Sequence, residues 1–222
     1  MFALQHSAKH KIASNYGKSY YPSDYSPNAG WADYYGNEDF FKAYPNDDRK
    51  EWNYMTEWKI KSGEIIPYTE SADKLPAISK YYDYDEGAPG KSAQSNGITC
   101  IYRYAEVLLM YAEASTRATN SVNQDALNAI QEVQKRAGYQ NRQIELTTTT
   151  EPAAFLTAVS NERGWEFFAE MKRWFELVRL EKVSEVRAET WNGSLFQSNN
   201  HYYFPIPYQQ IRLTQWTNNA GY

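Results

Sequence analysis

Three glutamates, Glu162, Glu166 and Glu170, recur at four-residue intervals in the sequence, with Arg163 and Arg173 close by. Four residues make about one turn of an α-helix, so the three carboxylates would form a row along one face. Paired carboxylates can catalyse the hydrolysis of a glycosidic bond. Neighbouring arginines would keep these carboxylates ionised, which suits an ion network better than a proton donor. We therefore predict a structural ion network of these five residues and no catalytic residue.

Aromatic side chains are the second group that could do chemistry. Phe, Trp and Tyr make up 16% of the 222 residues, with 20 tyrosines and seven tryptophans. A sugar can lay its C–H face on an aromatic ring, which contributes roughly 1 to 2.5 kcal/mol per ring. Trp31 is the strongest candidate because its small neighbours, Gly30 and Ala32, would leave its face accessible. The alternative for each ring is that it fills a core that is short of aliphatic side chains. The candidate glycan-stacking residues are Trp31, Tyr34, Tyr35, Tyr20, Tyr21, Tyr25, Trp52 and Tyr54.

Metal chemistry has weaker support in the sequence. His6 and His10 are four residues apart, but their segment favours a strand and lacks a third zinc ligand. Asp83, Asp85 and Glu86 could offer oxygen atoms to calcium, yet their spacing does not match an EF-hand loop. We predict no metal site and no cofactor.

Composition limits the class of partner and the compartment. The formal net charge is -4 and no long basic run occurs, which argues against nucleic acid or an anionic membrane surface as the main partner. The single Cys100 is expected to be structural. No apolar run approaches a membrane span, and the first residues lack the pattern of a signal peptide. If the protein is exported, we expect its signal to have been removed.

The elements that position the rings lie in residues 1–100, which are rich in Tyr, Gly, Pro, Asn and Ser. This composition predicts a loop-rich, ligand-facing region. Asn37 is expected to cap a short helix that ends before Pro45. Aromatic and β-branched residues on alternate positions of 51–69 predict a β-hairpin.

Residues 101–222 predict a helical region with an irregular tail from about Trp191. Residues 103–117 are apolar on nearly every side, so this helix should be packed all round, with Glu106 and Glu113 on a narrow polar face. Residues 125–137 predict a second helix, which Gly138 would close as a left-handed cap. Both helices together span 34 residues, the tetratricopeptide period.

A third helix is expected over residues 155–183, with Thr150 as a possible cap, and this helix would carry the acidic row. One solenoid repeat cannot cover its own apolar face. We therefore expect the two regions to form one structural unit, in a fragment that lacks preceding helical repeats.

Four motifs occur together and in a fixed order in the second half of the chain. They are RYAEVLLMYAEA at 103–114, ALNAIQEVQKRAG at 126–138, ER..WEF..E..RWFEL.R at 162–179 and FPIP..QI at 204–211. Together they resemble the C-terminal half of the SusD/RagB family, surface lipoproteins that bind nutrients for uptake. Met171 stands where that family usually has glycine.

The resemblance implies a mainly α fold with loop-rich regions and short strands, containing one tetratricopeptide-like helix pair of an α-α superhelix. It implies a protein that binds an oligosaccharide without catalysis and delivers it to a SusC-like TonB-dependent transporter. A peptide ligand is the alternative within the family, and glycoside hydrolysis is a weaker one. The full-length protein would be anchored to the outer membrane, at the cell surface, through an N-terminal lipid that this chain lacks.

Overall fold

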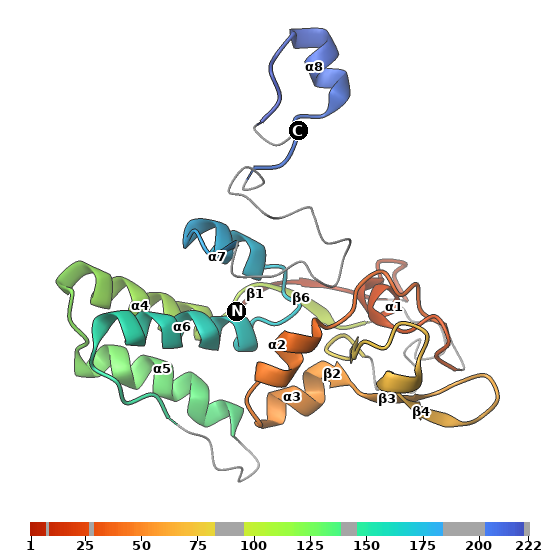
Figure 1. Cartoon of the computed structure of the whole chain (residues 1–222), viewed down its shortest axis with the longest axis horizontal. Helices are drawn as coiled ribbons and strands as arrows, with labels where there is room; N and C mark the ends of the chain where they lie inside the picture. Colours follow the sequence, from red (N-terminus) through yellow and green to blue (C-terminus); the bar gives the residue numbers. More distant parts are fainter. Residues whose placement is uncertain (8, 27–28, 83–95, 139–145, 184–202, 220–222) are drawn as a thin grey trace. The chain divides into compact units, whose positions relative to one another are not determined.

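The computed structural model describes residues 1–7, 9–26, 29–82, 96–138, 146–183 and 203–219, and divides into two compact units (Figure 1). Unit 1 comprises Met1–Glu170 and unit 2 comprises Met171–Tyr222. The fold is helix-rich with short strands, as the sequence predicted. In chain order, unit 1 contains β1 (Phe2–Gln5), α1 (Tyr16–Tyr20), α2 (Glu38–Ala43), α3 (Asp48–Asn53), β2 (Tyr54–Met55), β3 (Glu57–Lys59), β4 (Ile65–Pro67), η1 (Tyr68–Glu70), β5 (Ala77–Ile78), β6 (Ile98–Tyr102), α4 (Tyr104–Thr119), α5 (Gln124–Ala137) and α6 (Pro152–Glu166).

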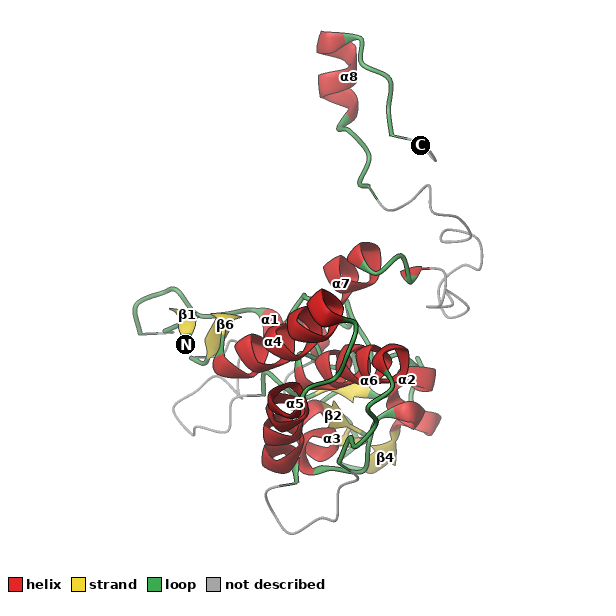
Figure 2. Ribbon diagram, turned by 90° about the vertical axis from the view of Figure 1, so that its left-hand side faces the viewer, coloured by secondary structure: helices red, strands yellow, loops and turns green. Residues whose placement is uncertain are grey.

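Helices α4, α5 and α6 pack side by side and enclose an apolar core (Figure 2). Asn123 begins α5 by accepting a hydrogen bond from the backbone N–H of Ala126 at 2.8 Å. Ala126, Ile130, Val133 and Ala137, which helical spacing places on one face of α5, are all buried. Gly138 has a φ of -96°, so the predicted left-handed cap is wrong. The core side chains are Leu109, Ala112, Ala126, Leu127, Ala129, Ile130, Val133, Phe155, Val159 and Phe167.

Helix α4 exposes the face that the sequence analysis expected to be packed. Glu106 and Glu113 are buried, whereas the side chains of Tyr104, Val107 and Tyr111 are exposed. The predicted polar face was therefore wrong. Helical periodicity separates the two faces of a helix, but which face is covered depends on the neighbouring segments. The tetratricopeptide resemblance of the α4–α5 pair stays a prediction.

The long third helix that the periodicity predicted is broken in two. Helix α6 ends at Glu166, and Ala169 and Met171 both have a φ of +59°, in the left-handed region. Glycine adopts this conformation without the steric cost of a Cβ atom, which fits the glycine that the resemblance expects at position 171. The cap is also corrected, since Glu151 accepts hydrogen bonds from the first backbone N–H groups of α6, in place of Thr150.

In the described residues, the loop-rich half of unit 1 contains three two-stranded antiparallel sheets and an isolated bridge between Tyr25 and Ile60. Strand β3 pairs with β4, with Trp58 opposite Ile66, within the predicted hairpin. Residues 51–53, expected to open that hairpin, belong instead to α3. Strand β2 pairs with β5, and β1 with β6. The predicted cap of α2 is confirmed, because the Asn37 side chain accepts a hydrogen bond from Phe40 N at 2.9 Å.

Unit 2 contains α7 (Arg173–Arg179) and α8 (Tyr208–Thr214). The tail was expected to be irregular, and α8 corrects that prediction for seven of its residues. The rings of Trp174 and Phe204 lie 6.1 Å apart between their centroids.

Candidate functional site

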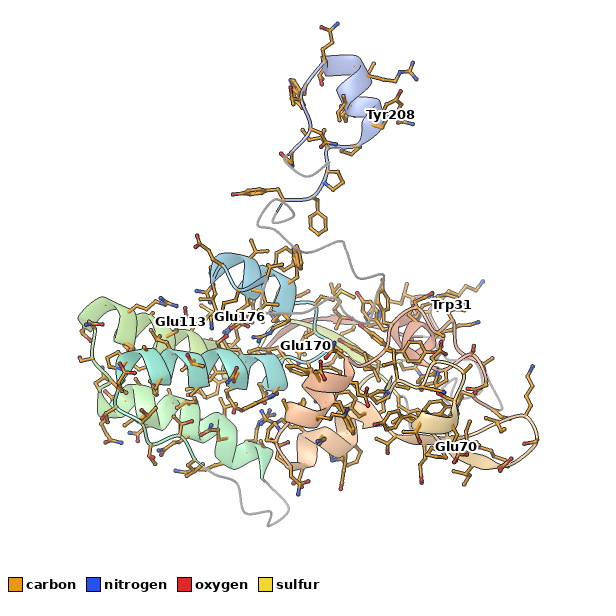
Figure 3. All side chains as sticks on the ribbon, viewed as in Figure 1. Trp31, Glu70, Glu113, Glu170, Glu176 and Tyr208 are labelled. Carbon is orange, nitrogen blue, oxygen red and sulfur yellow. The ribbon has the colours of Figure 1, made fainter. Side chains whose placement is uncertain are left out.

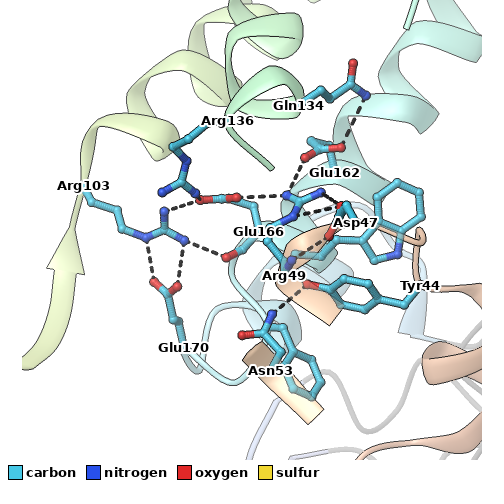
Figure 4. Close-up of polar contacts among 12 residues, drawn as sticks. Tyr44, Asp47, Arg49, Asn53, Arg103, Gln134, Arg136, Glu162, Glu166 and Glu170 are labelled. Atoms are coloured by element: carbon cyan, nitrogen blue, oxygen red, sulfur yellow. Dashed lines mark hydrogen bonds and ion pairs between the residues drawn. The ribbon is translucent and has the colours of Figure 1, made fainter. Parts of the chain in front are cut away.

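The carboxylate of Glu166 lies at the centre of a buried ion network (Figure 4). It accepts a hydrogen bond from Arg49 Nη1 at 2.9 Å, and its other oxygen accepts from Arg103 and Arg136. These three arginines come from α3, from the residue before α4 and from α5, so one carboxylate ties together three segments remote in sequence. The network therefore links the loop-rich half of unit 1 to its helices.

The other two glutamates of the predicted row extend the network in opposite directions. Glu162 accepts from Arg49 Nη1 at 2.7 Å and from Gln134 Nε2 at 3.3 Å. Glu170 accepts from Arg103 Nη2 and from Lys80 Nζ, each at 2.7 Å. All three predicted carboxylates thus take part in one network.

The predicted cations of the network are corrected. Arg163 Nη2 lies 3.7 Å from Glu106 Oε1. Arg173 belongs to unit 2, and its Nη1 lies 3.4 Å from Glu176 Oε2. Helical spacing can indicate only partners about one turn away in the chain. The actual partners Arg49 and Arg103 are more than 60 residues away in sequence, and no helical spacing could indicate them.

The network is balanced in formal charge, and its members other than the exposed Arg136 lie mostly out of water. Charge balance permits burial of ions that would otherwise be very costly to desolvate. Burial disfavours the ionised form of Glu166, but Arg103 and Arg136 outweigh this effect and hold the pKa of Glu166 below its usual value. Burial raises the pKa of Glu162. The cations are Arg49, Lys80, Arg103 and Arg136, and the carboxylates are Asp47, Glu162, Glu166 and Glu170.

The lowered pKa of Glu166 predicts a loss of stability in acid. Its stabilising contribution is complete above the unfolded-state pKa of about 4.3 and is lost as the pH falls through the lower folded-state value. Burial opposes ionisation of Glu170 too, but hydrogen bonds from Arg103 and the charge of Lys80 lower its pKa, so it adds the same trend. The raised pKa of Glu162 acts in the opposite sense and offsets part of the loss. We expect the free energy of unfolding, measured by urea titration, to fall between about pH 5 and pH 3.

A Glu166→Gln variant isolates this contribution from the other carboxylates of the chain. Its stability should depend less steeply on pH than that of the wild type over the same interval. If the stability of the variant and that of the wild type depend equally on pH, the pKa of Glu166 is not lowered in the folded protein.

Among the candidate glycan-stacking rings, three are well exposed. The relative exposure is 51% for Trp31, 58% for Tyr34 and 56% for Trp52. Trp31 lies beside α1, far from Glu113 on α4 (Figure 3). These rings have accessible faces, as a stacking role requires.

Tyr20, Tyr21 and Tyr54 are buried, so the prediction that they present a free face is wrong. Tyr54 packs among interior rings, 4.6 Å from Phe168 between ring centroids, and Tyr20 stacks on Tyr81 at 5.6 Å. Burial raises the pKa of Tyr20 to about 12. These side chains serve the alternative role, filling a core with few aliphatic residues.

Tyr25 and Tyr35 are half-buried and held by hydrogen bonds. The Tyr25 hydroxyl donates to the Tyr82 hydroxyl at 3.2 Å, and the Tyr35 hydroxyl donates to Asp73 Oδ2 at 2.5 Å. Both rings are thus less accessible than those of Trp31, Tyr34 and Trp52.

Backbone hydrogen bonds fix the segment that carries the exposed rings, residues 30–34, against residues 18–22. The N–H of Trp31 donates to Lys18 O at 2.7 Å, and the N–H of Tyr34 donates to Ser19 O at 3.2 Å. The Lys18 ammonium lies 5.0 Å from the centre of the Trp31 ring. The two exposed rings are thus held on one rigid segment, with a cation at one face of the indole.

Gly30 was predicted to leave the face of Trp31 accessible, but the structure gives this glycine a different role. A Cβ atom at Gly30 would lie 1.9 Å from the carbonyl oxygen of Tyr21. Glycine is therefore required for the close approach of two backbone segments, and not to open the face of Trp31.

A cavity of about 630 Å³ lies beside the ion network, and sequence analysis missed it. Trp165, half-buried, lines it together with Asp47, Arg49 and Glu162. Trp165 falls in the motif at 162–179, but only the packing of α6 against the loop before α3 turns it into part of a cavity wall.

The described residues offer no group of three metal-ligating side chains. His6 Nε2 lies 2.8 Å from the Thr99 hydroxyl, so its ring takes part in holding the chain next to β6. Asp83, Asp85 and Glu86 lie outside the described residues. Within the described part of the chain, no helix combines the length and apolar character needed to span a bilayer.

Fold and site together define a helix-rich protein in which a buried ion network holds helices against a loop-rich surface that displays aromatic rings. The chain belongs to the SusD family, whose sequence model matches residues 2–222.

The relatives agree with this assignment. SusD-like protein P2 of Formosa agariphila is 29% identical over 202 residues, which cover 82% of this chain and 39% of the relative. A SusD superfamily protein from Parabacteroides distasonis has the same fold, with a TM-score of 0.74 and 22% identity over the whole of this chain and 50% of the neighbour. Surface glycan-binding protein A from Bacteroides uniformis has a TM-score of 0.73 and 22% identity, over the whole of this chain and 48% of its own. The chain thus spans half or less of these relatives.

Proposed function

We propose that this protein binds an oligosaccharide without cleaving it and that Trp31 and Tyr34 form the central stacking surface. The observation that carries this proposal is the exposure of both rings on a segment fixed by backbone hydrogen bonds. A pre-positioned ring loses little conformational freedom when a ligand stacks on it. Trp52, exposed on α3, and the half-buried Tyr25 and Tyr35 are the further candidate contacts.

The proposed ligand is a glycan that the full-length protein passes to a SusC-like TonB-dependent transporter in the outer membrane. Two or three ring contacts at roughly 1 to 2.5 kcal/mol each give dissociation constants of about millimolar to micromolar after ordering costs. Weak binding suits a protein that must release its ligand again. A solved neighbour of the same fold is described as a surface glycan-binding protein, which supports a glycan over a peptide. We place the full-length protein at the cell surface, attached by an N-terminal lipid anchor.

Glycoside hydrolysis is the alternative that the acidic row raised. Both oxygens of Glu166 and of Glu162 accept hydrogen bonds from side chains of the network. Acceptance at both oxygens favours the ionised form, which is a poor proton donor, although burial raises the pKa of Glu162. The contacts therefore favour a structural role for the row.

Replacing Trp31 and Tyr34 together with alanine is expected to weaken oligosaccharide binding at least about tenfold, because one lost platform of 1.4 kcal/mol already corresponds to that factor. Binding is measured by calorimetric titration of the full-length protein with a panel of neutral oligosaccharides. Trp216→Ala is the matched control, since Trp216 is also exposed but lies in unit 2, and its binding should equal that of the wild type.

Release of reducing ends is assayed in the same samples. If reducing ends accumulate with the wild type and Glu162→Gln abolishes this, the protein is an enzyme and the proposal is wrong. Unchanged binding by the double variant would instead rule out the two rings as the stacking surface.

A further inference from the structure

The cavity beside the ion network is lined by side chains that do not belong to the proposed stacking surface. Its wall combines the half-buried ring of Trp165 with three exposed polar side chains, Asn46, Thr148 and Asn161. None of these three polar side chains has a hydrogen-bond partner within the described residues. Free amide and hydroxyl groups around one aromatic ring are the groups that a saccharide needs.

Hydrogen bonds hold the wall of this cavity in place. The side chain of Gln134 donates to the Thr147 hydroxyl and accepts from the Thr147 N–H, both at 2.9 Å, and Gln131 donates to the Thr147 carbonyl at 2.8 Å. These bonds hold the strip of residues 146–149 against α5. Gln134 also donates to Glu162, so the wall is continuous with the ion network.

The charges in the wall select the kind of ligand. Arg49 is neutralised by Asp47 and Glu162, which lie 2.6 and 2.7 Å from its guanidinium nitrogens. With one cation against two carboxylates, the lining has no surplus positive charge to attract an anion. A neutral polyol fits, because its hydroxyl groups can donate to carboxylates and accept from amides.

We propose that this cavity is a second saccharide subsite, which takes a short neutral oligosaccharide with one sugar on the indole of Trp165. It rests on the proposed glycan-binding function and adds a site remote in sequence from Trp31. Two separated weak sites on one glycan chain raise the overall affinity through effective concentration, without tighter contacts at either site.

The test uses the full-length protein labelled with 5-fluorotryptophan and follows the ¹⁹F signals of Trp165 and Trp31, assigned with Trp165→Phe and Trp31→Phe. Maltohexaose, cellohexaose and xylohexaose are titrated separately, and a galacturonate hexamer serves as the anionic probe. The Trp165 signal should shift and saturate with at least one neutral probe and stay still with the anionic one. Thr148→Phe, which adds a ring to the exposed part of the cavity lining, should raise the dissociation constant read from Trp165 at least about tenfold. Thr150→Phe is the matched control, because Thr150 is exposed but does not line the cavity, and should leave that constant within about twofold.

The outcomes separate the two proposals. If a neutral probe moves the Trp31 signal and not that of Trp165, the subsite is wrong and the stacking surface stands. If Trp165 responds equally in Thr148→Phe and in the wild type, its signal reports a remote change and the subsite is again wrong. If no neutral probe moves either signal, both proposals fail.

Discussion

Replacing Glu166 with alanine is expected to lower the free energy of unfolding by about 3–5 kcal/mol, the cost of removing one partner from a buried ion pair. Glu166 binds Arg49, Arg103 and Arg136, and its side chain is fully buried. The variant leaves Arg49 with Asp47 and Glu162, and it leaves a net positive charge in a poorly solvated region. The loss is therefore an electrostatic cost and not only the loss of three hydrogen bonds.

Urea unfolding followed by circular dichroism measures this difference. Glu132→Ala is the matched control, because Glu132 is exposed on α5, and it should change the stability by less than about 0.5 kcal/mol. Equal stability of Glu166→Ala and the control would show that the network is solvated in solution and does not join the two halves of unit 1.

Replacing Gly30 with alanine is expected to destabilise the chain by about 3 kcal/mol and to abolish stacking at Trp31. The new Cβ atom would lie 1.9 Å from Tyr21 O and 2.4 Å from Tyr21 C, and backbone atoms cannot rotate away as a side chain can. The segments must separate, which is the cost of overpacking together with the loss of some hydrogen bonds between them. Unfolding by urea gives the stability, and titration with the neutral oligosaccharides gives the binding.

The matched control is the substitution of an alanine by glycine at a neighbouring position. Ala32 has a φ of +55°, a conformation that favours glycine, so Ala32→Gly should keep the stability of the wild type or raise it by up to about 1 kcal/mol. If Gly30→Ala binds and unfolds like the wild type, the tight contact with Tyr21 does not hold Trp31 in place. If Ala32→Gly is less stable than the wild type, the alanine methyl group makes a contact that stabilises the fold by more than the positive φ costs.

The sequence by itself determined the family, the helix-rich class and several local features. The inward face of α5 and the cap at Asn37 follow from spacing and from side-chain to backbone hydrogen bonds within a few residues. The acidic row was also recognisable from its regular spacing, but its cations were not, because they come from segments remote in sequence. The cap at Asn37 is the case in which the deciding interaction is local in the chain.

Only the tertiary structure decided which groups meet. Glu166 binds Arg49 and Arg103 through contacts between segments far apart in sequence, and the burial of Tyr54 depends on Phe168 in the same way. The cavity at Trp165 exists because α6 packs against the loop before α3. The physical reason is that burial and ion pairing depend on which surfaces cover one another, and a residue's own neighbours in the chain do not specify that.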